Sequence, residues 1–278
     1  MIKIGRFNEL EVVKKVDFGV YLAEHSEAAT KILLPRKYVA DDLEIGDKIK
    51  VFIYLDSEDR IVATTEQPFA QVGEIKLLKC IDANKIGAFF DWGLEKDLFV
   101  PFKHQNFRMF KGESYVLKVL HDERSNRIIG SNCFHKILPC RVEDLTENQE
   151  VKMIVYGETD IGYKVIIDRK NLGMIFKNQI FQKVKLGDDL SGFVSKIRPD
   201  GKIDLVLQKS GFKNKLSEKD KVLEILKSAG GFMPITAKTT PAEIADIFGM
   251  SKRTYKQMIG MLYKERQVEI TDDGVRVL

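Results

Sequence analysis

A strand pattern that starts at a glycine occurs three times before residue 208, and this repeat restricts the possible folds most. The copies begin at Gly19, Gly87 and Gly162, and each glycine opens a short hydrophobic segment. A second glycine, an alternating segment, a charged turn and a closing segment follow at nearly the same spacing. Because an internal repeat indicates a repeated structural unit, the sequence predicts three consecutive modules of one kind.

Each module consists of short segments with the features of β-strands. Apolar and polar residues alternate in them, and β-branched residues are common, as is typical of strands. The third module also contains Pro-Asp-Gly at 199–201, a tight-turn signal between two alternating segments. About five short strands per module match the size of an OB-type barrel. We therefore predict a mainly β chain with three tandem OB-fold barrels, at 1–67, 68–137 and 138–210.

The periodicity changes to that of helices beyond residue 208. Capping residues at Ser217, Thr240 and Ser251 each precede an apolar stripe with helical spacing. Two short strand-like segments around an Asp-Asp-Gly turn close the chain. Three helices followed by a hairpin predict an α/β winged-helix domain over residues 215–278.

The composition says more about the compartment in which the protein is expected than about its function. The 278 residues carry a net charge of only +4, so a basic surface for nucleic acid would have to be local. Three cysteines are too few for a disulfide framework and suit a reducing compartment. Without a leader sequence or an apolar run of about 20 residues, the chain is expected to be cytoplasmic and without a membrane partner.

Aromatic residues beside the repeated glycines are the first candidates for a function. Phe18 and Tyr21 flank the glycine of the first module, and Phe89 follows that of the second. The second segment continues to Trp92, and we expect aromatics on the open face of the barrel. Exposed rings on an OB-type barrel stack on the bases of single strands. The alternative is that these rings belong to the core, where Phe is usually found.

A basic residue near the closing turn of each module is the second candidate. Arg60, Arg127 and Lys202 recur at this place, where a cation could hold a phosphate. Together with the rings, they favour a surface that binds a nucleic acid strand.

Two of the glycine segments resemble a known RNA-binding domain. Residues 18–21 read FGVY and residues 86–93 read IGAFFDWG. Both resemble the aromatic-glycine segment of the S1 domain, which is repeated in ribosomal protein S1. The resemblance implies an OB fold that binds single-stranded RNA.

The resemblance also assigns expected roles to individual residues. It implies that Phe18, Tyr21 and Phe89 are stacking aromatics and that Arg60 and Arg127 are the basic residues of the last hairpin. The chain departs from the S1 pattern at several positions. Where the family commonly has a histidine after the third strand, this chain has Pro35, Pro101 and Phe176. Ile86 and Ile161 stand in place of the first aromatic residue, and Lys164 stands in place of the second.

The whole chain is similar to a narrower family. Three such barrels before a winged helix, together with the segments 155–165 and 248–253, resemble the bacterial conserved virulence factor B family. That resemblance implies an RNA-binding protein that influences gene expression.

The winged helix is a second possible nucleic-acid site. Lys252, Arg253 and Lys256 are spaced to share one face of the third helix, the helix that enters the major groove in DNA readers. The alternative is an ordinary solvated surface. Nearby acidic residues offset the charge and weaken the case for duplex DNA: Glu243, Asp246, Asp272 and Asp273.

The sequence gives little support for a catalytic or metal site. Cys133, His135 and Cys140 lack the paired spacing of a zinc site. No nucleophile-and-base pattern or phosphate-binding glycine loop is present. We therefore expect no catalysis, cofactor, metal or small-molecule substrate.

The sequence thus favours a non-catalytic single-stranded RNA-binding protein that regulates gene expression after transcription. Two alternatives stay open. One is a DNA-binding transcription regulator that uses the winged helix, and the other is a ribosome-associated factor that docks through protein contacts.

Overall fold

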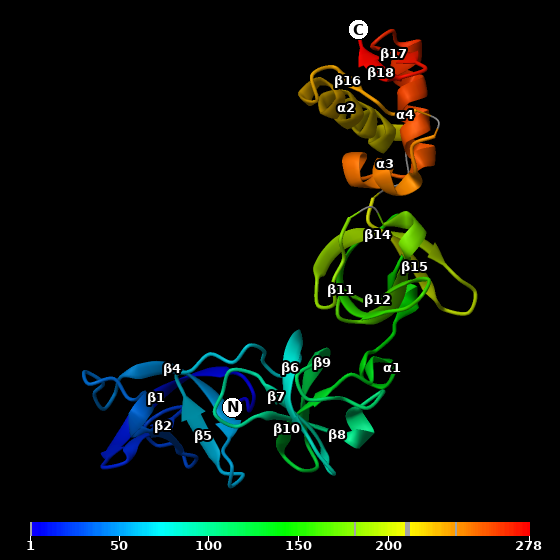
Figure 1. The fold of residues 1–278 in the computed structure, drawn as a ribbon. Helices are drawn as coiled ribbons and strands as arrows, with labels where there is room; N and C mark the ends of the chain where they lie inside the picture. Colours follow the sequence, from blue (N-terminus) through cyan, green and yellow to red (C-terminus); the bar gives the residue numbers. More distant parts are fainter. Residues whose placement is uncertain (1, 181, 209–211, 237) are drawn as a thin grey trace. The chain divides into compact units, whose positions relative to one another are not determined.

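The computed structural model describes residues 2–180, 182–208, 212–236 and 238–278. Contacts divide the chain into two compact units, 1–138 and 139–278. The first unit holds two β-barrels, and the second holds a third barrel and a helical domain (Figure 1). The predicted end of the third module, residue 210, lies outside the described residues.

The first barrel is closed by five strands in the order β1-β2-β3-β5-β4. Antiparallel pairing joins β1 to β4, and a parallel contact between Leu33 and Val62 joins β3 to β5. The apolar residues that point inward, such as Val12, Leu22 and Ile53, form its core. The strands are β1 (Phe7–Val16), β2 (Gly19–Ala23), β3 (Ile32–Pro35), β4 (Lys48–Leu55) and β5 (Ile61–Thr64).

The other two barrels repeat this strand order, so the prediction of three OB-type barrels is confirmed. Figure 1 shows the third barrel curling around its interior. The Pro-Asp-Gly turn is formed as expected, with Gly201 at φ 78°. The strands are β6 (Ile75–Ala83), β7 (Gly87–Asp91), β8 (Leu98–Pro101), β9 (Ser114–Asp122), β10 (Arg127–Ser131), β11 (Glu150–Glu158), β12 (Gly162–Ile167), β13 (Asn171–Phe176), β14 (Asp189–Ile197) and β15 (Ile203–Val206).

The repeated glycine has a steric reason. A Cβ on Gly19 would lie 2.1 Å from the carbonyl oxygen of Leu34, and one on Gly87 would lie 2.4 Å from that of Val100. The start of the second strand of each barrel thus approaches the backbone of the third strand too closely for any side chain. The repeat therefore marks a point of barrel closure.

The first and second barrels share a continuous core. Phe52 and Tyr54 on the outer face of β4 pack in one cluster with Trp92, and the rings of Phe52 and Trp92 meet edge to face at 5.9 Å. Trp92 is only 3% exposed, and its indole nitrogen donates to the carbonyl oxygen of Lys96 at 2.6 Å. The expectation that Trp92 lies on an open face is wrong, because the neighbouring barrel covers that face.

The C-terminal domain has the predicted winged-helix architecture. Thr240 forms a complete capping box with Glu243, as its position indicated. Two details differ from the prediction: the expected cap Ser217 lies inside the first helix, which is described from Phe212 onward, and the hairpin gains a third strand in the order β16-β18-β17. The elements are α2 (Phe212–Ser228), β16 (Phe232–Met233), α3 (Pro241–Phe248), α4 (Lys252–Lys264), β17 (Val268–Thr271) and β18 (Gly274–Val277).

Short helices lie in some of the connections. A 3-10 helix follows the third strand of each barrel, and the four-residue helix α1 (Phe134–Ile137) follows the second barrel. In the described part of the chain, no helix has the length and apolar character needed to cross a membrane. The same residues contain no cluster of three or more metal-binding side chains. The 3-10 helices are η1 (Arg36–Tyr38), η2 (Phe102–His104), η3 (Val142–Asp144) and η4 (Lys177–Gln179).

Candidate nucleic-acid interface

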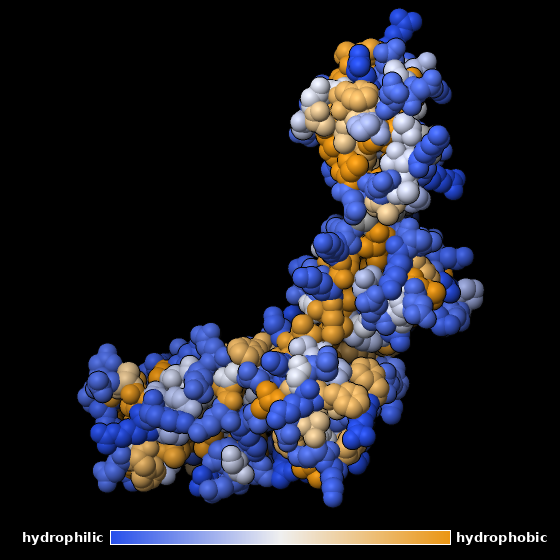
Figure 2. Space-filling model, viewed as in Figure 1, coloured by the Kyte–Doolittle hydropathy of each residue, from blue (hydrophilic) through white to orange (hydrophobic). Residues whose placement is uncertain are grey.

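Apolar side chains reach the surface between hydrophilic ones (Figure 2), and Phe18 is among the most exposed. It lies in the turn between β1 and β2 with 57% of its surface accessible, which excludes a core role. Tyr21 points outward from β2 and is half-buried, and the two rings meet edge to face at 6.4 Å. The first barrel therefore presents an aromatic pair to the solvent.

The backbone explains why this pair is exposed. Since Gly19 sits directly against β3, the residue before it stands at the rim of the barrel. The backbone N–H of Arg36 donates to the carbonyl oxygen of Phe18 at 2.9 Å and ties the start of η1 to this turn. The position of Phe18 thus follows from barrel closure.

A cation that the sequence reasoning missed lies beside the aromatic pair. The exposed Arg36 donates from Nη1 to the carbonyl oxygen of Asp17 at 3.3 Å, and among the described residues it forms no ion pair. Its neighbour Lys37 pairs with Glu95 of the second barrel at 2.6 Å, and this hydrogen bond raises the pKa of Lys37. The sequence signal for Arg36 was its place directly after Pro35, a position where the chain departs from the S1 pattern; the structure pairs Pro35 with the anchor glycine Gly19.

Arg60 lies in the turn between β4 and β5, where carboxylates already surround it. Its Nε donates to Asp56 at 2.8 Å and its Nη1 contacts Glu58 at 2.9 Å. The hydrogen bond with Asp56 raises the pKa of the guanidinium group. A phosphate at Arg60 would have to compete with these two groups.

Phe89 on the second barrel lies in a hollow of about 230 Å³. Its ring packs on that of Phe99 at 5.0 Å, with 33° between the planes. Arg127 and Trp92 line the same hollow. The structure therefore brings the predicted residues Phe89 and Arg127 together.

Arg127 also connects the two barrels. It forms an ion pair with Asp59 in the β4–β5 turn of the first barrel. Lys96 of the second barrel reaches the same turn, donating to the Asp59 carboxylate at 3.0 Å and to the Asp56 carbonyl oxygen at 2.5 Å. Hydrogen bonds from Arg127 and Lys96 lower the pKa of the Asp59 carboxyl. This three-residue contact, Asp59 with Lys96 and Arg127, is called the inter-barrel clamp below.

The third barrel lacks the aromatic pair. Ile161, 61% exposed, and Lys164 occupy the places of the two rings. The nearby Tyr163 ring has the ammonium group of Lys177 at 5.7 Å from its centre. This barrel presents a different surface from the first.

The three predicted cations of the winged helix line one hollow on α4 together with Gln257. Arg253 and Lys256 are exposed, whereas Lys252 is half-buried and donates to the Thr239 carbonyl oxygen at 2.5 Å. Asp272 and Asp273 of the closing hairpin line a neighbouring cavity with Lys252 and Lys256. Acidic groups therefore stand close to this basic face.

Two protein-family models match parts of the chain, one near each terminus. Residues 4–66 match the S1 domain, and residues 220–277 match the CvfB-like winged helix domain. Both domains belong to nucleic-acid-binding families, so the chain carries nucleic-acid-binding modules.

Curated relatives match nearly the whole chain. The uncharacterized protein YitL of Bacillus subtilis is 27% identical over 95% of this chain and 90% of its own length. Conserved virulence factor B of Staphylococcus epidermidis is 21% identical over 96% of this chain and 92% of its own length. A crystal structure from Streptococcus pneumoniae, described as a multidomain protein with nucleic acid binding domains, is 23% identical with a TM-score of 0.43, covering 99% of this chain and 98% of that one. With its match to the S1 domain, its match to the CvfB-like winged helix domain and relatives along nearly its full length, the chain is similar to the conserved virulence factor B family.

Proposed function

We propose that this protein is a non-catalytic, cytoplasmic single-stranded RNA-binding protein that regulates gene expression after transcription. The observation that carries the proposal is the outward-facing aromatic pair, the exposed Phe18 with the half-buried Tyr21, on a barrel that matches the S1 domain. Exposed rings are costly to leave in water, and on an OB-type barrel they are suited to stacking on bases.

In the proposed mechanism, Phe18 and Tyr21 stack on bases while Arg36 contacts a phosphate. Each stacked base contributes about 1 to 3 kcal/mol, largely independent of sequence. Arg36 suits the phosphate contact because no carboxylate pairs with it among the described residues. Arg60 and Arg127 can reach a phosphate only by giving up part of their ion pairs.

Phe89 extends the proposed surface onto the second barrel. The shared core and the inter-barrel clamp hold the two barrels together, so both can contact one strand without a flexible linker between them. Two modest contacts on one rigid support reinforce each other through effective concentration.

The test is a fluorescence-anisotropy titration of the full chain with labelled single-stranded RNA, single-stranded DNA and duplex DNA. Replacing both rings, Phe18→Ala with Tyr21→Ala, should weaken RNA binding by about tenfold to a thousandfold. Arg36→Ala should lower the slope of log affinity against log salt by about 0.7, the value for one phosphate contact on a single strand. Phe69→Ala, which removes another ring with 55% exposure, is the matched control. Unchanged RNA affinity in the double variant would refute the proposed role of the pair.

A second candidate function is duplex DNA binding through α4. The exposed positions of Arg253 and Lys256 support it, and the nearby Asp272 and Asp273 weaken it. Arg253→Ala with Lys256→Ala should abolish duplex binding and leave RNA binding intact if this reading holds. Failure of the unmodified chain to bind any of the three nucleic acids would instead support docking to a ribosome through protein contacts.

A further inference from the structure

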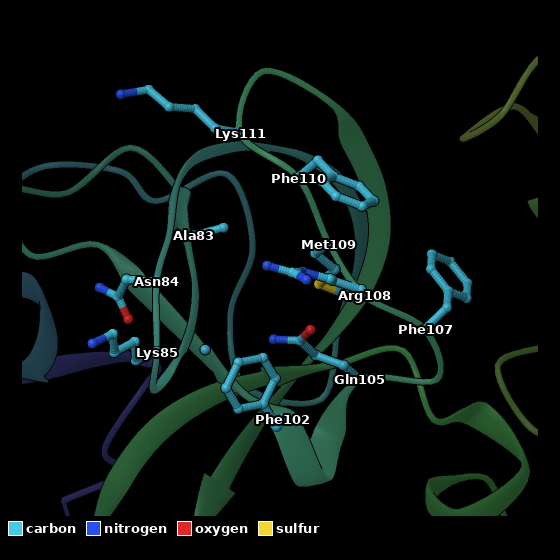
Figure 3. A pocket seen from close by; sticks show the side chains of 11 residues that line it. Ala83, Asn84, Lys85, Phe102, Gln105, Phe107, Arg108, Met109, Phe110 and Lys111 are labelled. Carbon is cyan, nitrogen blue, oxygen red and sulfur yellow. The ribbon is translucent and has the colours of Figure 1, made fainter.

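The second barrel carries an open cleft that the sequence patterns did not indicate. It has a volume of about 780 Å³ and lies between the β6–β7 loop, the 3-10 helix η2 and the segment 105–111 (Figure 3). The side chains on which the argument rests are Lys85, Phe102, Phe107, Arg108, Phe110 and Lys111. Its size is within the usual range of ligand-binding clefts.

Three phenylalanine rings give the cleft its apolar character. Phe102, Phe107 and Phe110 are 51%, 53% and 57% exposed, and they lie within nine residues of one another in the sequence. The ring of Phe107 leans on Tyr115 at 5.8 Å, and the Tyr115 hydroxyl accepts from the backbone N–H of Phe110 at 3.0 Å. Tyr115 therefore supports the Phe107 ring and the backbone at Phe110, while all three rings stay open to solvent. Exposed apolar groups gathered in this way mark an interaction site.

Three cations give the same cleft its charge. Lys85, Arg108 and Lys111 line it, and none of the described lining residues is acidic. Within the described parts of the chain, no ion pair connects these three cations to a carboxylate. The Arg108 guanidinium lies 5.8 Å from the centre of the Phe110 ring, and Figure 3 shows it between Phe110 and Phe102. Cations set among aromatic faces suit a ligand that combines flat rings with negative charge.

The corresponding place in the first barrel shows that the fold alone does not create this cleft. Gly19 pairs with Pro35 there as Gly87 pairs with Pro101 here, so Arg36 and Phe102 are equivalent positions. The hollow beside Gly19 has a volume of about 240 Å³ and no aromatic lining, and Asp41 lines it. Lys15 and Arg36 also line that hollow, so the second barrel differs from the first by its aromatic rings, its larger cleft and the absence of an acidic residue among the described lining residues.

We propose that this cleft binds consecutive nucleotides of single-stranded RNA, with Phe102 and Phe110 stacking on bases while Arg108 and Lys111 contact phosphates. The proposal rests on the proposed function, because it adds a binding site for the same strand. Gly87 lines the cleft and opens the strand that carries Phe89, so the cleft continues the predicted surface of the second barrel. An RNA on this surface would be held at both barrels of the first unit.

The experiment compares four full-length proteins in anisotropy titrations with single-stranded RNA of about 6 and about 16 nucleotides. They are the unmodified chain, Phe102→Ala with Phe110→Ala, Phe18→Ala with Tyr21→Ala, and the control Phe69→Ala. The cleft variant should bind the longer RNA about tenfold to a thousandfold more weakly than the unmodified chain and the control. The lost rings are exposed, so the Tm should stay unchanged, which shows that weaker binding is not unfolding.

A charge variant tests the phosphate contacts separately. Arg108→Glu should reduce the slope of log affinity against log salt by at least about 0.7, whereas Lys76→Glu, at an exposed lysine on β6, should change it less. If the unmodified chain binds RNA but the cleft variant binds it equally well, the cleft proposal is refuted and the proposed function stands. If the unmodified chain binds no RNA at either length, both proposals fail.

Discussion

Phe52→Ala tests whether the first two barrels behave as one structural unit. The ring of Phe52 is fully buried on the outer face of β4, and it meets Phe7 at 5.4 Å and Trp92 at 5.9 Å. Removing a buried Phe costs about 3 to 5 kcal/mol, part of which comes from edge-to-face pairs worth about 0.5 to 1.5 kcal/mol each. Because Trp92 belongs to the second barrel, the variant should destabilise that barrel as well.

Native-state hydrogen exchange measured peptide by peptide is the suitable assay. If the free energy of unfolding falls by about 3 kcal/mol, hydrogen exchange through global opening should become roughly a hundredfold faster. We expect this acceleration in β4 of the first barrel and also in β9 of the second. Peptides from the third barrel serve as an internal reference.

Ile53→Ala is the matched control on the same strand. Ile53 points to the opposite face and is buried in the core of the first barrel alone. Ile53→Ala should therefore destabilise the first barrel directly, by about 2 to 5 kcal/mol. If Phe52→Ala left exchange in β9 at the unmodified rate, the barrels would be independent, and the reasoning from their shared core would be refuted.

Two further predictions concern charge and capping. Asp59→Asn should lower the Tm of the first unit at neutral pH, because the folded-state pKa of Asp59 is depressed by Arg127 and Lys96. A carboxyl group whose pKa is depressed in the folded state stabilises the fold above its unfolded pKa of about 4, and this stabilisation is lost as the pH falls through the folded pKa. Thermal melts should therefore show the Tm difference between the unmodified chain and Asp59→Asn shrinking below about pH 4. A Tm difference that stays constant with pH would contradict the charge argument. Thr240→Ala should destabilise the winged helix by about 0.5 to 2 kcal/mol through loss of the capping box, measured by urea unfolding, and Thr239→Ala at the preceding threonine should cost less than Thr240→Ala.

Local signals were enough for the predicted architecture. The repeated glycine, the alternating segments and the Pro-Asp-Gly turn each act over a few residues, and the observed barrels contain all three. The capping box at Thr240 likewise depends only on its own turn of helix. By contrast, the cap predicted at Ser217 was wrong, because Ser217 is a favourable cap in sequence but lies inside α2.

The candidate site was predictable only in part. The exposed position of Phe18 follows from the glycine beside it, and the departure from the S1 pattern at Pro35 could have drawn attention to the adjacent Arg36. The aromatic and basic cleft had no sequence signal of its own, because the β6–β7 loop and the segment after β8 meet only in the folded barrel.

The sequence by itself determined the modules, their order and the aromatic pair of the first barrel, since these depend on neighbours along the chain. The tertiary structure alone decided which faces stay open and which charges are already paired. Trp92 is buried because a second barrel packs over it, and Arg127 meets Asp59, which lies 68 residues earlier in the chain. Periodicity tells which side of a strand is apolar, but only packing between barrels decides whether solvent or another barrel covers the outer side.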